Sequence, residues 1–366
     1  MTDDRATDDP ATNDRATLNG AARRYSDLAR KFRPGTPDVG SFGTMRGRKT
    51  YCRAAGLMEL HDVLVLPGEW LVVAGDQVLC DFFVQTPSPP MTAYLMEFDF
   101  GYDDIELIYE HPREPPIETA FLLGGCRNYS HWLLDYLPRL ALLGDPTVPL
   151  LVNAPLAPFQ VASLRASGIG EHRLLPLAYP SAVSVRHLFY PDLCSSSFTP
   201  PRSLRPGVLA WLRETFAPLM ASGRRDRKIF ISRGEEREPH RRRLLNHDEI
   251  AGIARNHGFE VVAMEQLNFA DQVRMFAEAA VIVGAHGAGL ANMAFAPTGA
   301  EVVELIGPRL SDSEWSMGYA RIAPFLGLEF TRIVGNSDAR TPVAFDHLPY
   351  ETYVIDPGEL ETVLRR

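Results

Sequence analysis

Apolar and polar positions alternate along the chain in two patterns, one typical of strands and one typical of helices. From about residue 46 to 115, short β-rich runs are separated by proline and glycine turns. After that, compact apolar runs alternate with stretches of helical periodicity. The expected strands lie at 119–125, 149–154, 173–178 and 184–190, and the expected helices at 128–143 and 157–167.

The second half of the chain repeats this alternation more regularly. Asn246 with Glu249 three residues later has the pattern of a helix-capping box. Asp356-Pro357 with Glu359 predicts the start of a final helix. Apolar strands separated by amphipathic helices favour a parallel sheet that is covered on both faces. The other expected elements are strands at 227–233, 259–264, 281–287 and 301–307, and helices at 270–280 and from Gly289.

The length of the chain predicts two domains, because 366 residues are more than one hydrophobic core usually serves. Residues 1–45 begin with a repeat rich in Asp, Thr and Ala, and we expect a disordered or partly helical tail. An N-terminal α/β domain over 46–205 and a C-terminal Rossmann-like domain over 206–366 follow, joined by the proline-rich stretch 199–207. The expected fold class is α/β, with two Rossmann-like domains facing each other across a cleft.

Composition and charge exclude several classes of protein. A formal net charge of −9 does not suit a chain that coats nucleic acid. The four cysteines are scattered without a CxxC pair, which argues against a zinc knuckle or a disulfide scaffold. The start MTDDRATDDP lacks the pattern of a signal peptide, and no apolar run reaches the length of about 18 residues that spans a bilayer. We therefore expect a cytoplasmic protein, with peripheral attachment to the inner face of the plasma membrane as an open alternative.

A glycine-rich turn lies between the strand at 281–287 and the helix after it. Glycines let the backbone approach a ligand closely, and the N–H groups at a helix start attract a diphosphate. The alternative interpretation is a tight turn that needs small residues for packing. The spacing does not match GxGxxG, so a nicotinamide fingerprint is not indicated. The candidate binding residues are His286, Gly287, Ala288, Gly289 and Leu290.

Glu304 lies inside the apolar strand at 301–307, where a carboxylate needs a partner. At the C-terminal end of a parallel strand, it could accept hydrogen bonds from two ribose hydroxyls. A structural salt bridge is the alternative.

The local charge reverses at residues 224–243, where nine Arg or Lys against four acids give a net charge of +5. Arg233 directly follows a predicted strand, and Arg242 and Arg243 follow shortly after. Guanidinium groups suit diphosphate oxygens, so these three arginines are candidate donor-binding residues. The alternative is a solvated basic loop, which we favour for Arg224, Arg225 and Arg227.

The helix predicted at 128–143 carries polar residues at helical spacing on an otherwise apolar surface. Asn128, His131, Asp135 and Arg139 are separated by three, four and four residues, so they share one side of the helix. Asp135 or His131 could act as general base toward an acceptor hydroxyl, and Asn128 and Arg139 could bind substrate. The alternative is an Asp135–Arg139 pair with Asn128 as a helix cap.

Three blocks of sequence together resemble glycosyltransferase family 61. They are NYSHWLLDYLPRLALL, KIFISRGEE with the later RRRLLN, and GFEVVAMEQLNFADQVRMFAEAAVIVGAHGAGLANMAFAPTGAEVVELIGP, and the resemblance covers about residues 120–310. It implies a GT-B-type fold, inversion at the anomeric carbon and a donor such as UDP-linked xylose, N-acetylglucosamine or arabinose. Bacterial members of the family are associated with capsular or other surface polysaccharides. Ser130 departs from the family pattern, where glycine is expected.

The resemblance assigns the candidate residues to two sides of a transfer reaction. Arg233, the later arginine and the turn at His286 correspond to the nucleotide side, and the segment from His131 to Asp135 corresponds to the acceptor side. The expected partners are a nucleotide-sugar and a glycan or lipid-linked glycan acceptor, with no cofactor and no metal site. Two alternatives stay open: a nicotinamide- or SAM-dependent α/β enzyme, and a non-catalytic carbohydrate-binding protein on a transferase scaffold.

Overall fold

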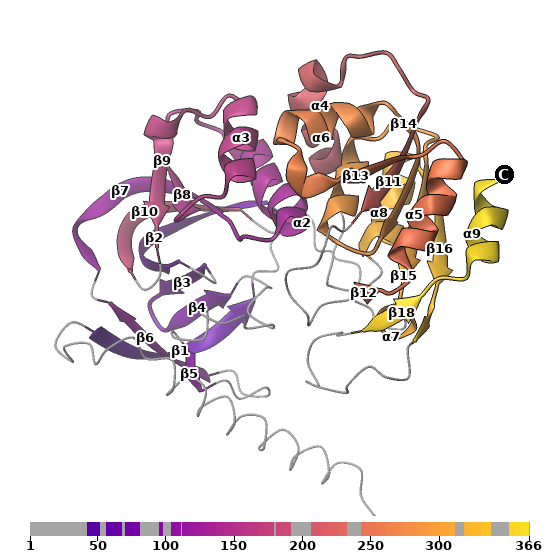
Figure 1. Cartoon of the computed structure of the whole chain (residues 1–366). Helices are drawn as coiled ribbons and strands as arrows, with labels where there is room; N and C mark the ends of the chain where they lie inside the picture. The colour runs from indigo at the N-terminus through magenta and orange to yellow at the C-terminus, as the bar shows by residue number, and fades with distance from the viewer. Residues whose placement is uncertain are drawn as a thin grey trace, which may run out of the picture. The chain divides into compact units, whose positions relative to one another are not determined.

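A computed structural model shows two compact parts of the chain, each described by itself (Figure 1). Unit 1 comprises Met1–Leu122 and Pro176–Tyr190, and unit 2 comprises Leu123–Leu175 and Pro191–Arg366. The structure describes residues 42–51, 56–67, 70–80, 95–97, 104–110, 112–178, 181–191, 206–232, 243–311, 318–337 and 351–365.

The division of the chain differs from the boundary predicted at 205/206. Residues 123–175 group with the C-terminal half and not with the preceding strands. The predicted tail and the proline-rich connection fall mostly outside the described residues. Of these segments, the structure describes residues 42–45, which begin a strand, and residues 206–207, which begin a helix.

Unit 1 is a sheet in which antiparallel pairs predominate. Among the strands assigned to unit 1 the order is β5-β6-β1-β4-β3-β2-β10-β7, with β1/β4 and β7/β10 pairing in parallel. The pairs β5/β6, β6/β1, β4/β3 and β3/β2 are antiparallel. The strands are β1 (Phe42–Tyr51), β2 (Leu57–Leu66), β3 (Leu71–Ala74), β4 (Gln77–Cys80), β5 (Leu95–Glu97), β6 (Asp104–Glu110), β7 (Arg113–Gly124) and β10 (Val183–Pro191).

The described residues of unit 1 contain no helix, which differs from the α/β domain predicted for 46–205. Short runs separated by glycine turns form hairpins, and antiparallel pairing needs no helical crossover. The link between β3 and β4 is such a turn, with Gly75 at φ +63°. The helices predicted at 128–143 and 157–167 lie in unit 2 instead.

Unit 2 confirms the parallel sheet predicted for the second half. Its described residues form a five-stranded sheet in the order β13-β11-β14-β15-β16, in which every pairing is parallel. If the strands are numbered 1 to 5 along the chain, their order across the sheet is 2-1-3-4-5. The direction in which the chain winds therefore reverses between β11 and β14. The strands are β11 (Arg227–Ser232), β13 (Glu260–Ala263), β14 (Ala279–Ala285), β15 (Glu301–Ile306) and β16 (Glu329–Val334).

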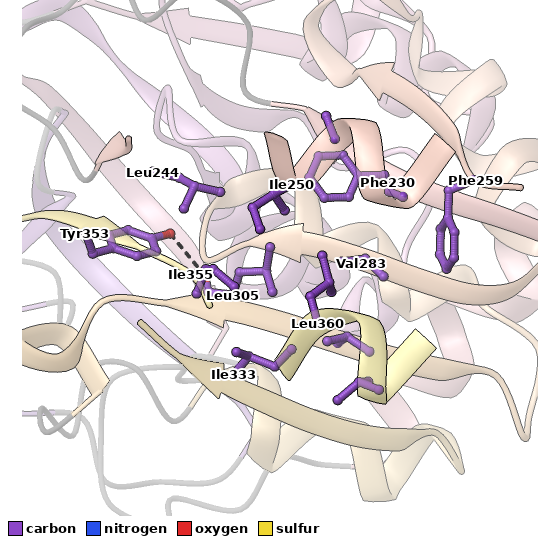
Figure 2. Close-up of a cluster of buried hydrophobic side chains, with 14 residues drawn as sticks. Phe230, Leu244, Ile250, Phe259, Val283, Leu305, Ile333, Tyr353, Ile355 and Leu360 are labelled. Atoms are coloured by element: carbon purple, nitrogen blue, oxygen red, sulfur yellow. Dashed lines mark hydrogen bonds between the residues drawn. The ribbon is translucent and has the colours of Figure 1, made fainter. Parts of the chain in front are cut away.

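One face of this sheet is covered by α5 (His247–Asn256) and α9 (Pro357–Leu364), which contact each other. Figure 2 shows Ile250 and Leu360 from these helices against Phe230, Val283 and Leu305 from three neighbouring strands. All five side chains are at most 1% exposed. Alternate residues of each strand therefore supply one continuous core, as the period of two in a strand requires.

A second group of helices in unit 2 pack against one another, and the segment that follows Asn128 packs among them. Contacts join α4 to α6, η8 and η5, and join η8 to α2, α6, α8 and β14. The helices are α2 (Tyr129–His131), η4 (Trp132–Tyr136), η5 (Leu137–Leu142), α3 (Pro158–Ala166), α4 (Pro206–Met220), α6 (Phe269–Ala277), η8 (Ala288–Phe295) and α8 (Gly318–Leu326). Among the described residues, no helix is both long enough and apolar enough to cross a membrane.

Two predicted helices differ in type from the expectation. The segment predicted at 128–143 consists of one α-helical turn, the π-helical η4 and the 3₁₀-helical η5. Pro138 has no N–H to donate, so a regular α-helix cannot continue through it. The helix predicted from Gly289 is also 3₁₀.

The two predicted caps have different outcomes. Asp356 accepts a hydrogen bond from the Glu359 backbone N–H at 3.0 Å, which confirms the predicted cap of α9. Asn246 makes no cap hydrogen bond. Its side chain bonds the backbone N–H and C=O of Ile355, so a contact 109 residues away replaces the predicted cap.

Short elements complete unit 2. A small sheet in the order β12-β18-β17 is formed from segments that the sequence analysis did not assign. The remaining elements are β8 (Leu150–Asn153), η6 (Glu171–Arg173), β9 (Leu174–Leu177), β12 (Arg243–Leu244), η7 (Met264–Gln266), α7 (Pro308–Ser311), β17 (Asn336–Ser337) and β18 (Thr352–Val354).

Candidate functional site

His131 and Asp135 form a hydrogen-bonded pair in unit 2. His131 Nδ1 lies 2.8 Å from Asp135 Oδ2, as the predicted spacing of four residues allows. The Asp135 side chain is 0% exposed and that of His131 is 15% exposed. A carboxylate only accepts hydrogen bonds, so it holds the imidazole proton on Nδ1 and leaves the lone pair on Nε2.

The other two polar residues of this segment support the backbone. The Asn128 side chain accepts hydrogen bonds from the backbone N–H groups of Ser130 and His131, at 2.9 Å and 3.3 Å. This is the helix cap that was the alternative interpretation for Asn128. Arg139 is 1% exposed, and its guanidinium donates to the backbone carbonyls of Asp135 and Leu123. Such burial does not favour direct contact of Arg139 with a substrate.

A second histidine is held by a second buried carboxylate. His286 Nδ1 lies 2.6 Å from Glu304 Oε1, and Arg332 Nε donates to Glu304 Oε2 at 2.7 Å. Glu304 is paired directly with Arg332 across β15 and β16, and with Gly284 on the other side. The sheet register therefore brings these charged groups together.

This geometry favours the alternative interpretation of Glu304. The side chain is 0% exposed, and protein groups occupy both of its oxygens. A fully buried charge is tolerated when it is paired and hydrogen-bonded in this way. The ribose contact predicted from the sequence therefore has no support, and Glu304 instead orients His286.

The glycine-rich turn is compatible with both interpretations made from the sequence, which are tight packing and ligand binding. A Cβ at Gly284 would lie 3.0 Å from Ile231 Cβ, and one at Gly289 would lie 3.1 Å from Met264 Cγ, so these two glycines are required for packing. Gly287 precedes η8 in an extended conformation, and Leu290 is buried. The first N–H groups of a helix have no intrahelical acceptor, so those at the start of η8 can serve a ligand.

Tyr319 links the two histidine segments. Its hydroxyl lies 2.8 Å from the Gly287 carbonyl oxygen and 3.1 Å from Ser130 Oγ. One hydroxyl has one proton, so it donates to the carbonyl and can accept from the serine. Its ring also lies 5.4 Å from that of His286. Residues adjacent to both histidines therefore bond to the same atom.

A second bridge joins the same segments. The Tyr129 hydroxyl donates to Asn292 Oδ1 at 2.6 Å, and Asn292 Nδ2 donates to Gln272 Oε1 at 2.9 Å. Burial raises the pKa of Tyr129, and the hydrogen bond to Asn292 opposes this only in part. The hydroxyl is therefore a permanent donor at physiological pH. The acceptor-side and nucleotide-side segments are thus parts of one compact unit.

The predicted arginines are only partly described. Arg233 and Arg242 lie outside the described residues. Arg243 begins β12 with an exposed side chain, and its backbone N–H donates to the Glu351 carbonyl at 2.8 Å. The sequence places Arg233 directly after Ser232, the last residue of β11. The described strand β11 ends at Ser232, at the switch point of the sheet, where ligands bind in such folds.

Sequence reasoning missed three residues of this network. Tyr129 bonds Asn292, 163 residues away, and Tyr319 bonds Ser130, 189 residues away. Arg332 bonds Glu304, 28 residues away. No local spacing connects positions so far apart. The position of Arg332 between Phe330 and Ile333 in β16 was the one available signal, since a cation that is partly buried needs a partner.

Comparisons with known proteins give the family resemblance of this region. Residues 129–303 match the family model described as Glycosyltransferase 61. The matched segment begins at Tyr129 and includes the His131–Asp135 pair, the turn at His286 and the first half of β15.

Two relatives share part of the chain. Alpha-1,3-arabinosyltransferase XAT3 of Oryza sativa subsp. japonica is 30% identical over 125 residues, which are 33% of this chain and 18% of that protein. Protein O-linked-mannose beta-1,4-N-acetylglucosaminyltransferase 2 of Xenopus tropicalis is 33% identical over 91 residues, which are 25% of this chain and 16% of that protein. The chain therefore spans less than a fifth of the length of these curated relatives. These matches support a glycosyltransferase.

Proposed function

We propose that this chain is an inverting glycosyltransferase. It transfers a sugar from a UDP-linked nucleotide-sugar to a hydroxyl of a glycan or glycolipid acceptor. The observation that carries the proposal is the Tyr319 hydroxyl, which contacts both Ser130 and Gly287. Through these neighbouring residues it connects two histidines that lie within the region matching a glycosyltransferase family, and each histidine is bonded to a buried carboxylate.

His131 is the general base of the proposed reaction. Asp135 is fully buried, so an acceptor hydroxyl does not reach it, whereas His131 is partly exposed and oriented by Asp135. Nε2 of His131 removes the acceptor proton as the acceptor oxygen forms a bond to the anomeric carbon. The bond from that carbon to the diphosphate oxygen breaks on the opposite face, which inverts the configuration.

The donor diphosphate lies at the start of η8 in this proposal. Backbone N–H groups of Gly287, Ala288 and Gly289 donate to its oxygens, with His286 beside them. Arg233, with Arg242 or Arg243, balances the charge that develops on the departing nucleotide, as the family resemblance implies. Glu304 contributes by orienting His286. No metal takes part in this proposal, so transfer should persist in EDTA.

The cellular setting of the proposal rests on the family resemblance. We infer an enzyme of capsular or other surface polysaccharide synthesis that acts in the cytoplasm, with peripheral attachment to the inner face of the plasma membrane. In such an enzyme the donor side belongs to unit 2, whose parallel sheet supports it.

The test is transfer or donor hydrolysis by the His131→Gln variant across a panel of UDP-sugars. We expect kcat to fall about 10²- to 10⁴-fold, the usual contribution of a general base, while UDP affinity stays unchanged. Asp135→Asn should also lower kcat, because the imidazole tautomer is no longer held. His172→Gln is the matched control, because His172 is exposed and lies in η6.

Three outcomes would contradict this assignment. Normal turnover by His131→Gln would exclude it as the base. The absence of stabilisation by UDP together with stabilisation by NAD or SAM would favour the alternative enzyme classes, because a ligand stabilises the state that binds it. UDP-sugar binding without transfer or hydrolysis would favour a non-catalytic carbohydrate-binding protein.

A further inference from the structure

Three side chains that can bind a cation lie together in unit 1. His187 Nε2 is 3.1 Å from Glu59 Oε2. The rings of His61 and His187 stack with their centroids 4.7 Å apart and an angle of 10° between their planes. One ligand atom from each of Glu59, His61 and His187 lies within 4.8 Å of the other two. The three groups therefore lie close enough together to share one ion.

The backbone places these groups on the accessible side of the sheet. Glu59 and His61 are two residues apart on β2, so both side chains point to one face, and both are exposed. Val63 continues the same spacing but is 2% exposed. Asp62, at φ 51°, interrupts the alternation between them. Strand β10 is the neighbour of β2 in the sheet and supplies His187.

The donor set has the chemistry of a transition-metal site. Two imidazole nitrogens with one carboxylate oxygen suit Zn²⁺, which accepts three protein ligands and a water molecule in a tetrahedral site. Tetrahedral ligand atoms about 2.0–2.1 Å from zinc lie about 3.3 Å from one another. The Glu59–His187 pair already has this spacing, and the exposed His61 ring must turn out of its stack on His187 to direct a nitrogen at the same ion.

We propose that Glu59, His61 and His187 form a Zn²⁺ site on unit 1, with water as the fourth ligand. The ion replaces the proton that His187 now shares with Glu59. It joins strands whose residues are 128 positions apart in the sequence, so binding favours the folded state of unit 1. The proposal does not depend on the transferase function and assigns no part in transfer to the metal.

The experiment is calorimetric titration of Zn²⁺ into the full-length protein after removal of metals with EDTA and dialysis. We expect a site of one ion per chain whose affinity falls at least about 10- to 100-fold in His61→Gln and in His187→Gln. Co²⁺ should give visible absorption bands of a tetrahedral site in the wild type and lose them in both variants. Zn²⁺ should also raise the melting temperature of the wild type more than that of either variant.

Two controls keep the result specific. His172→Gln removes an exposed histidine outside the cluster and should leave Zn²⁺ affinity unchanged. Glu59→Gln is isosteric and should weaken binding while the metal-free circular dichroism spectrum matches that of the wild type. Absence of a one-to-one site, or Zn²⁺ affinity that is equal in the wild type, His61→Gln and His187→Gln, would overturn the proposal.

Discussion

At the scale of single residues, buried carboxylates determine what the histidines of unit 2 can do. Asp135 and Glu304 are both 0% exposed, and each accepts a hydrogen bond from the Nδ1 of one histidine. Glu304 also pairs with Arg332, on the neighbouring strand. Asp135 instead orients His131, which is the last residue of α2. The same arrangement therefore leaves Nε2 of His131 available as the proposed base, and it fixes the orientation of the His286 ring beside the proposed diphosphate site.

The buried hydroxyl of Tyr129 gives a prediction about alkaline pH. Burial raises its pKa, so the folded state binds this proton more tightly than the unfolded state, where the pKa is about 10. The resulting stability is complete below about pH 10 and is lost as the pH rises above it. We expect the free energy of unfolding in urea to fall less steeply above pH 10 for Tyr129→Phe than for the wild type. Equal slopes for the two proteins would contradict this role of burial.

At the scale of elements, glycines in unit 2 have two different functions. A Cβ at Gly289 in η8 would lie 3.1 Å from Met264 Cγ and 3.2 Å from Ile231 Cγ2, so these side chains would have to shift to make room for it. Gly252 lies within α5, and a Cβ there would meet nothing within 4 Å. Close packing of η8 on β11 therefore depends on Gly289, whereas α5 gains nothing from Gly252.

Alanine substitution at these two positions should have opposite effects. Gly289→Ala should lower the free energy of unfolding by about 1–3 kcal/mol, because it overpacks a filled site. Gly252→Ala should raise it by up to about 1 kcal/mol, because alanine favours the helix. Urea denaturation of both variants measures the difference. Destabilisation by both, or by neither, would show that the space around the Cβ does not decide the outcome.

At the scale of the whole molecule, the two units have their own hydrophobic cores. In unit 2, Leu360 of α9 is buried against Ile250 and against strand residues such as Val283 (Figure 2). In unit 1, Val65 and Leu71 are buried on β2 and β3. A cavity in one core should therefore weaken one unit first.

Leu360→Ala tests this independence by hydrogen exchange of the full-length protein. The substitution removes a fully buried side chain and should cost about 2–5 kcal/mol of local stability. We expect faster exchange in β11, β14 and β15 and unchanged exchange in β2, β3 and β4. Equal acceleration in both sets of strands would mean that the units unfold together.

Local patterns identified much of unit 2 but little of how its parts meet. The strands predicted at 281–287 and 301–307 correspond to β14 and β15, because apolar runs of this length are recognisable without context. The predicted helix at 128–143 is instead a succession of helix types, and the Asn246 side chain bonds the backbone of Ile355 and the side chain of Glu249 instead of capping the backbone of α5. Contacts over 109 residues compete with the local cap, and local sequence does not encode that competition.

The sequence by itself determined the parallel α/β character of the second half, the family resemblance and the His131–Asp135 pair, because strand alternation and helix spacing are local properties. Tertiary structure decided which groups share a site. Sheet register aligned Glu304 with Arg332, and packing brought Tyr319 to both Ser130 and Gly287. It also brought Glu59 and His61 to His187, since pairing of distant strands depends on the fold of the whole chain.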